Sequence, residues 1–139
     1  MAVHKHTLQH IKYPNIFAVG DCAGTPNSKT AAAVRAQAAL VVENLLAHRE
    51  GKALSGQYDG YASCPLTTSK GKITLAEFGY DGVVMSSFAS DPRRPLQRYW
   101  HLKKRFLPWL YWNMMLKGNT QPDWHAKREY PEALPSIRP

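Results

Sequence analysis

The sequence predicts a small α+β fold, and three features carry this prediction. A short apolar run at residues 16–19 ends at Gly20-Asp21 and leads into a long helical pattern at residues 30–48. Two strand-like runs, residues 61–66 and 72–78, come next. The C-terminal third is aromatic and basic, with helical character. At 139 residues, the chain is long enough for one domain with a core of its own.

The first part of the chain, residues 1–52, is expected to contain an extended lead-in at residues 1–14, a buried strand at 16–19 and the helix. Either Ser28 or Thr30 can cap the start of the helix, and Gly51 marks its end. The helix is expected to bury an apolar face made of Leu40, Val41, Leu45 and Leu46.

The second part, residues 53–92, is expected to form a β-hairpin with its turn at residues 67–71. Residues 72–78 alternate in polarity, which places Ile73, Leu75 and Glu77 on one face. A further edge strand is predicted at residues 83–88.

The third part, residues 93–139, is expected to contain two short amphipathic helices. The first covers residues 96–106 and the second residues 109–117, with a break or kink at Pro108. The Pro-rich tail from residue 121 is expected to be irregular.

The positive charge of the chain is concentrated in this third part. Between Arg93 and Arg128 there are nine basic residues and one acidic residue, a balance that equals the net charge of +8 of the whole chain. This composition suits an anionic membrane surface, and the apolar residues can alternatively close a domain core. Nucleic-acid binding is not expected, because no groove-entering or base-stacking motif accompanies the charge.

Several classes of protein are excluded by composition. No run approaches the roughly 18 uninterrupted apolar residues of a membrane-spanning helix, and a secretory signal is not expected. Two cysteines do not make a disulfide framework. His4, His6 and His10 are clustered without Cys or carboxylate partners, so no metal site is predicted and these side chains are expected to be solvated. The expected location is peripheral (monotopic) on a membrane, at its cytoplasmic face.

The turn at Gly20-Asp21 indicates a nucleotide cofactor. A buried strand that ends there presents a carboxylate beside a helix start, where backbone N–H groups can hold a flavin nucleotide. The alternative is that Asp21 only caps the following loop. The Gly-x-Gly-x-x-Gly turn that grips a pyrophosphate does not occur in the sequence.

Short motifs in order between about Thr7 and Gly118 point to one family. They are Gly20-Asp21, Ser28-Lys29-Thr30-Ala31-Ala32-Ala33, Gln37, Tyr58-Asp59-Gly60-Tyr61, Ser63-Cys64-Pro65-Leu66, Leu75-Ala76-Glu77-Phe78 and the segment from Leu107 to Gly118. The sequence resembles the C-terminal portion of sulfide:quinone oxidoreductases, in particular their mitochondrial-type branch, within the FAD-dependent pyridine nucleotide-disulfide oxidoreductase superfamily.

The resemblance implies the closing strand and helix of a Rossmann-like FAD-binding domain, followed by the hairpin and the C-terminal amphipathic helices. It implies that FAD is bound by Gly20, Asp21, Lys29, Thr30 and Gln37. From the residues alone, Lys29 can equally be a solvated loop lysine, and Gln37 can be an ordinary surface residue. Quinone or membrane contact is assigned to Phe106, Leu107, Trp109, Tyr111, Trp112 and Met115.

Cys64 is the expected chemical centre. The resemblance implies that it takes up sulfide sulfur together with a second cysteine, and that electrons then pass through FAD to a quinone. Without the resemblance, a cysteine before a proline in a strand is commonly an inert buried residue. Cys22 is expected to pack beside the cofactor.

The sequence therefore predicts a C-terminal fragment of a flavoprotein that oxidises sulfide, inactive alone because the Gly-rich turn and the partner cysteine are missing. Its expected partners are sulfide, a ubiquinone-type quinone, an anionic membrane surface, and either the missing N-terminal portion or a second copy. Two rivals remain: a fragment like type II NADH:quinone oxidoreductase, which does not require Cys64, and a non-catalytic basic membrane-binding module, which requires neither Asp21 nor Cys64.

Overall fold

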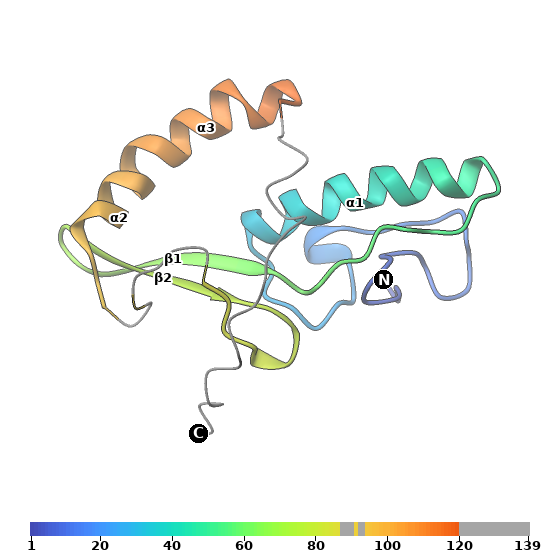
Figure 1. The fold of residues 1–139 in the computed structure, drawn as a ribbon, viewed down its shortest axis with the longest axis horizontal. Helices are drawn as coiled ribbons and strands as arrows, with labels where there is room; N and C mark the ends of the chain where they lie inside the picture. The colour runs from blue at the N-terminus through green and yellow to red at the C-terminus, as the bar shows by residue number, and fades with distance from the viewer. Residues whose placement is uncertain (87–90, 92–93, 120–139) are drawn as a thin grey trace. The chain divides into compact units, whose positions relative to one another are not determined.

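The computed structural model describes residues 1–86, 91 and 94–119, and these residues form a small α+β arrangement (Figure 1). The chain divides into two compact units. The first contains Met1–Ser63 and Phe78–Met85, and the second contains Cys64–Glu77 and the described residues from Ser86 onward. The main elements are α1 (Ala31–Arg49), β1 (Ala62–Ser69), β2 (Lys72–Phe78), α2 (Gln97–His101) and α3 (Leu107–Asn113).

Helix α1 begins and ends where the sequence predicts. The Thr30 hydroxyl accepts a hydrogen bond from the Ala33 N–H at 3.2 Å, which satisfies one of the free donors of the first turn. At the other end Gly51 has φ +68°, and the Lys52 N–H donates to the Ala47 carbonyl. This is the Schellman arrangement that glycine favours at a helix C-terminus.

The buried face of α1 differs from the predicted one. Its fully buried positions are Ala33, Gln37 and Asn44, whereas Leu45 and Leu46 are 45% and 42% exposed. Asn44 is responsible, because its side-chain amide donates to the carbonyls of Thr7 and Gly56 and accepts from the Gly56 N–H. These bonds place Asn44 on the inner face, so the neighbouring Leu45 and Leu46 turn outward; Leu40 and Val41 are half-buried against the core.

The lead-in folds back on itself and does not run extended. Val3 pairs with His10 in an antiparallel bridge, and Leu8 is completely buried. The aromatic core around Leu8 consists of Tyr58, Tyr61 and Tyr80, with Met85. The expectation that the three histidines are solvated is wrong for His6, because its Nδ1 donates to the Tyr58 carbonyl at 2.9 Å.

The strand predicted at residues 16–19 is reduced to one bridge, in which Phe17 pairs with Gln9. Only Ala18 is buried in this run. Its backbone bonds within the described residues go to the lead-in, from His10 N–H to the Ile16 carbonyl and from Ala18 N–H to the Leu8 carbonyl. A central strand needs partners along both edges, and the lead-in supplies one.

The predicted hairpin forms, but its turn is shorter than predicted, because residues 67–69 belong to β1 and only Lys70 and Gly71 lie between the strands. β1 and β2 pair through a two-residue loop in which Gly71 has φ +80°, a conformation that glycine adopts without strain. Ile73, Leu75 and Glu77 of β2 are all buried, which confirms the predicted alternation. In the second unit, Ile73 and Leu75 pack with Tyr99 of α2, and Ile73 also bridges to Leu96.

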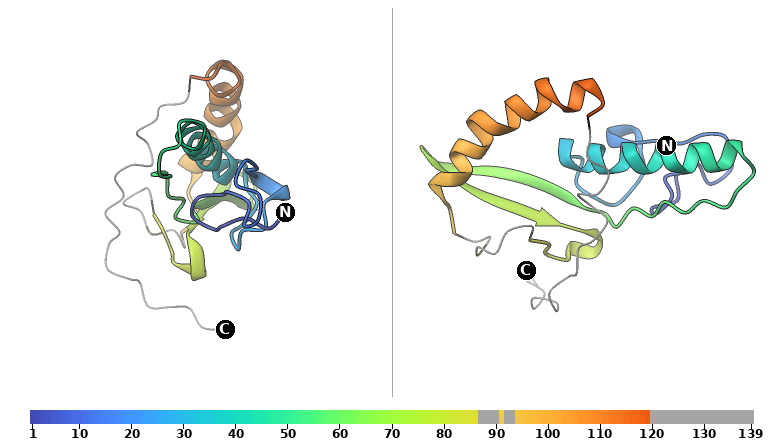
Figure 2. Two further views of the ribbon diagram at one scale, coloured as in Figure 1. Left: turned by 90° about the vertical axis from the view of Figure 1, so that its right-hand side faces the viewer. Right: turned by 45° about the horizontal axis from the view of Figure 1, so that its top comes forward.

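The two predicted C-terminal helices form one helical run, because α2 and α3 are joined by a π-helical turn, Leu102–Phe106 (Figure 2). The Leu107 N–H donates to the Leu102 carbonyl, five residues back. Pro108 has no N–H and its ring crowds the carbonyl four residues earlier, so a wider turn before it accommodates the ring without ending the helix.

The edge strand predicted at residues 83–88 is present only as a bridge between Phe78 and Val84. Residues 87 and 88 lie outside the described residues, as does the tail from residue 121.

Candidate functional site

The Gly20 turn is held by a buried hydrogen bond from α1. Gly20 opens a 3₁₀ turn, Gly20–Cys22, and its N–H donates to the Gln37 side-chain oxygen at 2.8 Å. Gly20 has φ +65°, and a Cβ there would lie 3.1 Å from Cγ2 of Val34. Glycine is therefore favoured by the backbone conformation, and a Cβ would also crowd Val34. The turn leaves the Asp21 carboxylate exposed, as a ligand-binding carboxylate would have to be.

Gln37 lies at the centre of this corner and is completely buried. Its side-chain nitrogen has no hydrogen-bond partner among the described residues, although the amide faces the Tyr58 hydroxyl. Burial raises the pKa of that hydroxyl above its ordinary value, and the Gln37 amide offsets part of the rise. A buried amide donor without a partner is uncommon in proteins and is costly.

The Tyr58 hydroxyl belongs to a polar network that sequence reasoning did not find. It donates to the Tyr61 carbonyl at 2.6 Å and accepts from the Asn27 amide at 2.9 Å. Tyr80 packs edge-on against Tyr58, and its hydroxyl donates to the Lys5 carbonyl. Burial also raises the pKa of Tyr80, to about 12. The Tyr-Asp-Gly-Tyr motif drew attention to Tyr58 and Tyr61. The partners at residues 5 and 27 could not be found from it, because they are distant in sequence.

Lys29 orders the loop that leads into α1. Its ammonium donates to the carbonyls of Ala23 and Thr25 and to the Thr25 hydroxyl, each at 2.8 Å. Lys29 is thus bonded to its own loop and is not simply solvated. Thr30, the next residue, caps α1. Its hydroxyl also accepts a hydrogen bond from the Ser63 N–H at 3.4 Å.

The two cysteines lie in different settings. Cys64 is half-buried on β1, and Cys22 is exposed. Cys22 is exposed because the Gly20–Cys22 turn buries Gly20 and leaves its next two residues outside, and its packing beside a cofactor stays a prediction. The Cys22 thiol donates to the Val19 carbonyl. One residue after Cys64, the Pro65 carbonyl accepts a hydrogen bond from Lys103.

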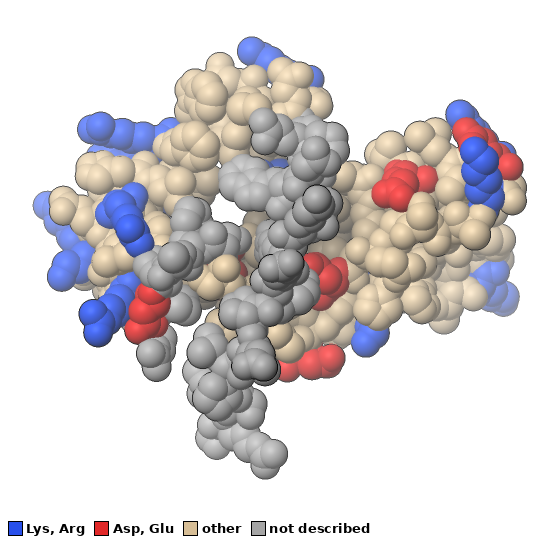
Figure 3. All heavy atoms as spheres, in the orientation of Figure 1, with Lys and Arg blue, Asp and Glu red and all other residues tan. Residues whose placement is uncertain are grey.

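The helical run of the second unit presents an aromatic surface. Trp109 and Trp112 are 52% and 65% exposed, and Phe106 and Tyr111 are also exposed. Leu107 and Met115 are half-buried, and Leu110 is buried. An open groove of about 580 Å³ runs along the helix, lined by Arg98, His101, Leu102, Arg105, Phe106 and Trp109. Figure 3 shows Lys and Arg side chains gathered over α2 and the tip of the hairpin.

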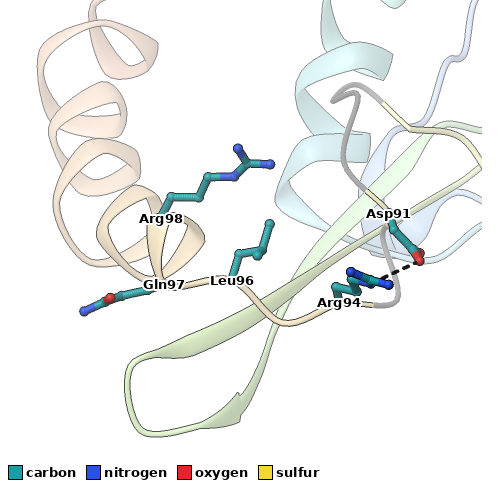
Figure 4. A pocket seen from close by; sticks show the side chains of 5 residues that line it. All are labelled: Asp91, Arg94, Leu96, Gln97 and Arg98. Atoms are coloured by element: carbon teal, nitrogen blue, oxygen red, sulfur yellow. Dashed lines mark ion pairs between the residues drawn. The ribbon is translucent and has the colours of Figure 1, made fainter.

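A second hollow, of about 550 Å³, lies at the start of α2 (Figure 4). It is lined by Asp91, Arg94, Leu96, Gln97 and Arg98. The Arg94 guanidinium lies 3.8 Å from the Asp91 carboxylate, and because the arginine is mostly exposed this pair adds little stability. None of the residues predicted to bind the cofactor lines this hollow.

Among the helices that the structure describes, none is both long enough and apolar enough to cross a membrane.

Three curated proteins match nearly the whole chain, each named mitochondrial sulfide:quinone oxidoreductase. The protein of Schizosaccharomyces pombe is 44% identical over 92% of this chain, that of Dictyostelium discoideum 49% over 84%, and that of Mus musculus 43% over 84%. The matched regions are only 28%, 26% and 26% of those proteins, so this chain spans about a quarter of their length. No protein-family model matches the chain.

A solved structure has the same fold. It is a chain in the cryo-EM structure of the Tetrahymena thermophila mitochondrial ATP synthase, F1Fo composite tetramer model, with a TM-score of 0.69 and 32% identity. The match covers 78% of this chain and 27% of that one. The three curated relatives confirm the resemblance that the sequence motifs indicated. Over nearly its whole length, this chain is a relative of the C-terminal portion of mitochondrial sulfide:quinone oxidoreductases.

Proposed function

We propose that this chain is part of a flavoprotein that oxidises sulfide and delivers two electrons through FAD to a membrane quinone. The observation that carries the proposal is the 43–49% identity to three proteins named for this activity. Because the chain spans about a quarter of those proteins, the activity belongs to a longer protein in which this chain supplies one part of the site. In this proposal the chain supplies the closing strand and helix of a Rossmann-like FAD-binding domain. It also supplies a redox cysteine and a membrane-facing helix.

The corner around Gly20 fits a flavin. The turn is compact because its first residue has no Cβ, and the Asp21 carboxylate is exposed beside it. Asp21 would accept a hydrogen bond from a ribityl hydroxyl, and Gly20 and Thr30 would bring backbone close to the cofactor. Gln37 would act indirectly, because its side-chain oxygen accepts from the Gly20 N–H and holds the turn in place. FAD, when bound, supplies the two-electron relay between sulfur and quinone.

Lys29 is not a freely available cation in this proposal, because its ammonium is already bound within its own loop. Its ammonium already has three acceptors at 2.8 Å in the loop of residues 23–25. It would therefore act first by fixing the loop next to Asp21, and from that fixed position its charge would stabilise negative charge on a reduced flavin.

Cys64 is the sulfur-accepting residue in the proposal. It takes up sulfide sulfur together with a second cysteine of the longer protein, and the thiolate is the reactive form. The half-buried position of Cys64 on β1 leaves part of its side chain accessible, as this chemistry needs.

The aromatic helix is the membrane-contacting part. Trp and Tyr at headgroup depth with Arg and Lys beside them are typical of interfacial helices, and a lipid quinone must enter from the bilayer. The curated relatives are named mitochondrial, so we assign the protein to a mitochondrial membrane in place of the cytoplasmic face expected from the sequence.

The Tetrahymena structure favours a second candidate. A chain with this fold is present in a structure of a mitochondrial ATP synthase, which is consistent with a structural role within a membrane complex. Such a role would not depend on Cys64. The rival of type II NADH:quinone oxidoreductase has no comparable support from the relatives.

Replacement of Cys64 in the complete protein separates these candidates. We expect Cys64→Ser to keep FAD bound but to lose rapid flavin reduction by sulfide, because a serine hydroxyl cannot form a persulfide. The measurement is anaerobic bleaching of flavin absorbance after mixing with sulfide. Cys22→Ser is the matched control and should bleach normally. If the flavin of Cys64→Ser bleaches as fast as that of the parent, sulfide chemistry at this residue is refuted. That result would favour the structural role in a membrane complex.

A further inference from the structure

Lys103 connects the helical run to the strand that carries Cys64. It lies in the π-helical turn Leu102–Phe106, and its ammonium donates to the Pro65 carbonyl at 2.9 Å and to the Thr67 hydroxyl at 3.1 Å. These acceptors are 38 and 36 residues away in sequence. All four residues, Cys64 included, belong to the second unit. We call the Lys103 ammonium with its two acceptors the Lys103 latch.

The latch acts at a weak point of β1. Pro65 has no backbone N–H, so at this position the strand cannot donate a hydrogen bond to any neighbour. Residues 66–69, the remainder of β1, are exposed. The apolar cluster that joins helix and hairpin uses Ile73 and Leu75 of β2, with Tyr99. Thus β2 is attached to the helix by apolar packing. β1 is attached to the helix by charge-assisted hydrogen bonds from Lys103.

The geometry points to Lys103 as a positioning residue for Cys64. By holding the Pro65 carbonyl and Thr67, Lys103 fixes the backbone that immediately follows Cys64 and limits the local opening of that segment. The inference deepens the proposed function and rests on it, because a fixed Cys64 matters for chemistry only if Cys64 is the sulfur-accepting residue. Lys103 itself does not touch the reacting sulfur in this account.

The latch also links two regions that the proposed function treats separately. Lys103 is on the same helical run as Trp109 and Trp112, which form the exposed aromatic surface. A helix that docks on a membrane through those residues is therefore tied by hydrogen bonds to the strand of Cys64.

The test measures how fast Cys64 reacts with iodoacetamide between pH 6 and 9.5, in the full 139-residue chain with Cys22→Ser so that Cys64 alone reports. In Lys103→Met we expect the limiting rate at high pH to rise about three- to tenfold, because local opening is no longer opposed by two charge-assisted hydrogen bonds. Lys103→Arg, which can donate to the same acceptors, should restore the slow rate.

Lys104→Met is the matched control. It removes the same charge from the neighbouring position, and Lys104 makes no such contact within the described part of the chain, so its alkylation rate should stay at the parent value. Thermal unfolding midpoints of the two variants should agree, which excludes global destabilisation. Equal alkylation rates in Lys103→Met and Lys104→Met would overturn the latch, as would failure of Lys103→Arg to restore the slow rate.

A second arm uses the complete protein and sulfide-driven flavin reduction. Lys103→Met should lower the limiting rate at saturating sulfide several-fold, with FAD content unchanged, and Lys103→Arg should recover it. An unchanged limiting rate would refute the positioning role even if alkylation changes. Normal flavin bleaching in Cys64→Ser would instead refute the proposed role of Cys64. In that case the alkylation rates of the Lys103 and Lys104 variants would still decide whether the latch restrains β1.

Discussion

At the scale of single residues, the candidate site depends on polar groups that are buried and paired. Gln37 and Asn44 are both completely inaccessible, and both hold backbone segments outside α1. The burial of such amides is favourable only when their hydrogen bonds are made. Gln37 satisfies its oxygen with the Gly20 N–H and leaves its nitrogen unpaired among the described residues. That nitrogen faces the Tyr58 hydroxyl inside the core, so Gln37 acts on the Gly20 turn through its oxygen.

Gly20→Ala tests the corner at this scale. Alanine at φ +65° costs roughly 1–2 kcal/mol, and its Cβ would also press on Val34, so we expect the free energy of unfolding to fall by about 2–3 kcal/mol. Gly51→Ala is the control, because it has φ +68° and open space around its Cβ, and it should lose only the conformational part. Urea unfolding of both variants decides the question. Equal losses would mean that crowding at Gly20 is unimportant.

At the scale of elements, each helix and strand has one decisive local signal. The Thr30 cap and Gly51 set the ends of α1, and the two-residue loop sets the hairpin. Pro108 was predicted to break or kink the helical pattern, and no break occurs, because the π-helical turn before it keeps the run continuous. The result is a helix long enough to carry both the Lys103 latch and the aromatic surface.

The aromatic surface gives a prediction about membranes. Trp109→Ala with Trp112→Ala should weaken binding to anionic vesicles at least about tenfold at high salt, where apolar insertion remains and charge attraction is screened. Pelleting of vesicles at low and high salt measures this. Ile11→Ala with Tyr13→Ala removes exposed apolar side chains from the first unit and should bind like the parent. If the Trp variant pellets as well as the parent at high salt, the helix does not anchor the protein.

At the scale of the whole molecule, the chain holds only part of the flavin site that we propose. The corner around Gly20 is formed, but the Gly-x-Gly-x-x-Gly turn does not occur in this sequence. The three curated relatives are about four times as long as the matched regions. Function therefore has to be tested in a complete protein, and folding can be tested in this chain.

We expect this 139-residue chain by itself to retain FAD weakly or not at all. A pyrophosphate grip contributes several charge-assisted hydrogen bonds, each worth about 1.5–3 kcal/mol, and this sequence has no such turn. Gel filtration after incubation with FAD, followed by the absorbance of the protein peak, measures retention. Stoichiometric yellow cofactor in that peak would contradict the expectation and would mean that the Gly20 corner binds flavin without the turn.

The sequence by itself determined the α+β class, the ends of α1, the hairpin with the buried face of β2, and the family relationship. These features depend on signals within a few residues, such as caps, turn glycines and alternation, or on motifs matched one by one.

The tertiary structure alone decided which face of α1 is buried, that the lead-in folds under it, and that Lys103 reaches Pro65. It also reduced the strand at residues 16–19 to a single bridge. In each case the deciding partner is distant in sequence: Thr7 and Gly56 for Asn44, Leu8 for Ala18, and the hairpin for Lys103. Local periodicity cannot predict such partners, because burial and hydrogen bonding depend on contacts between separate segments of the chain.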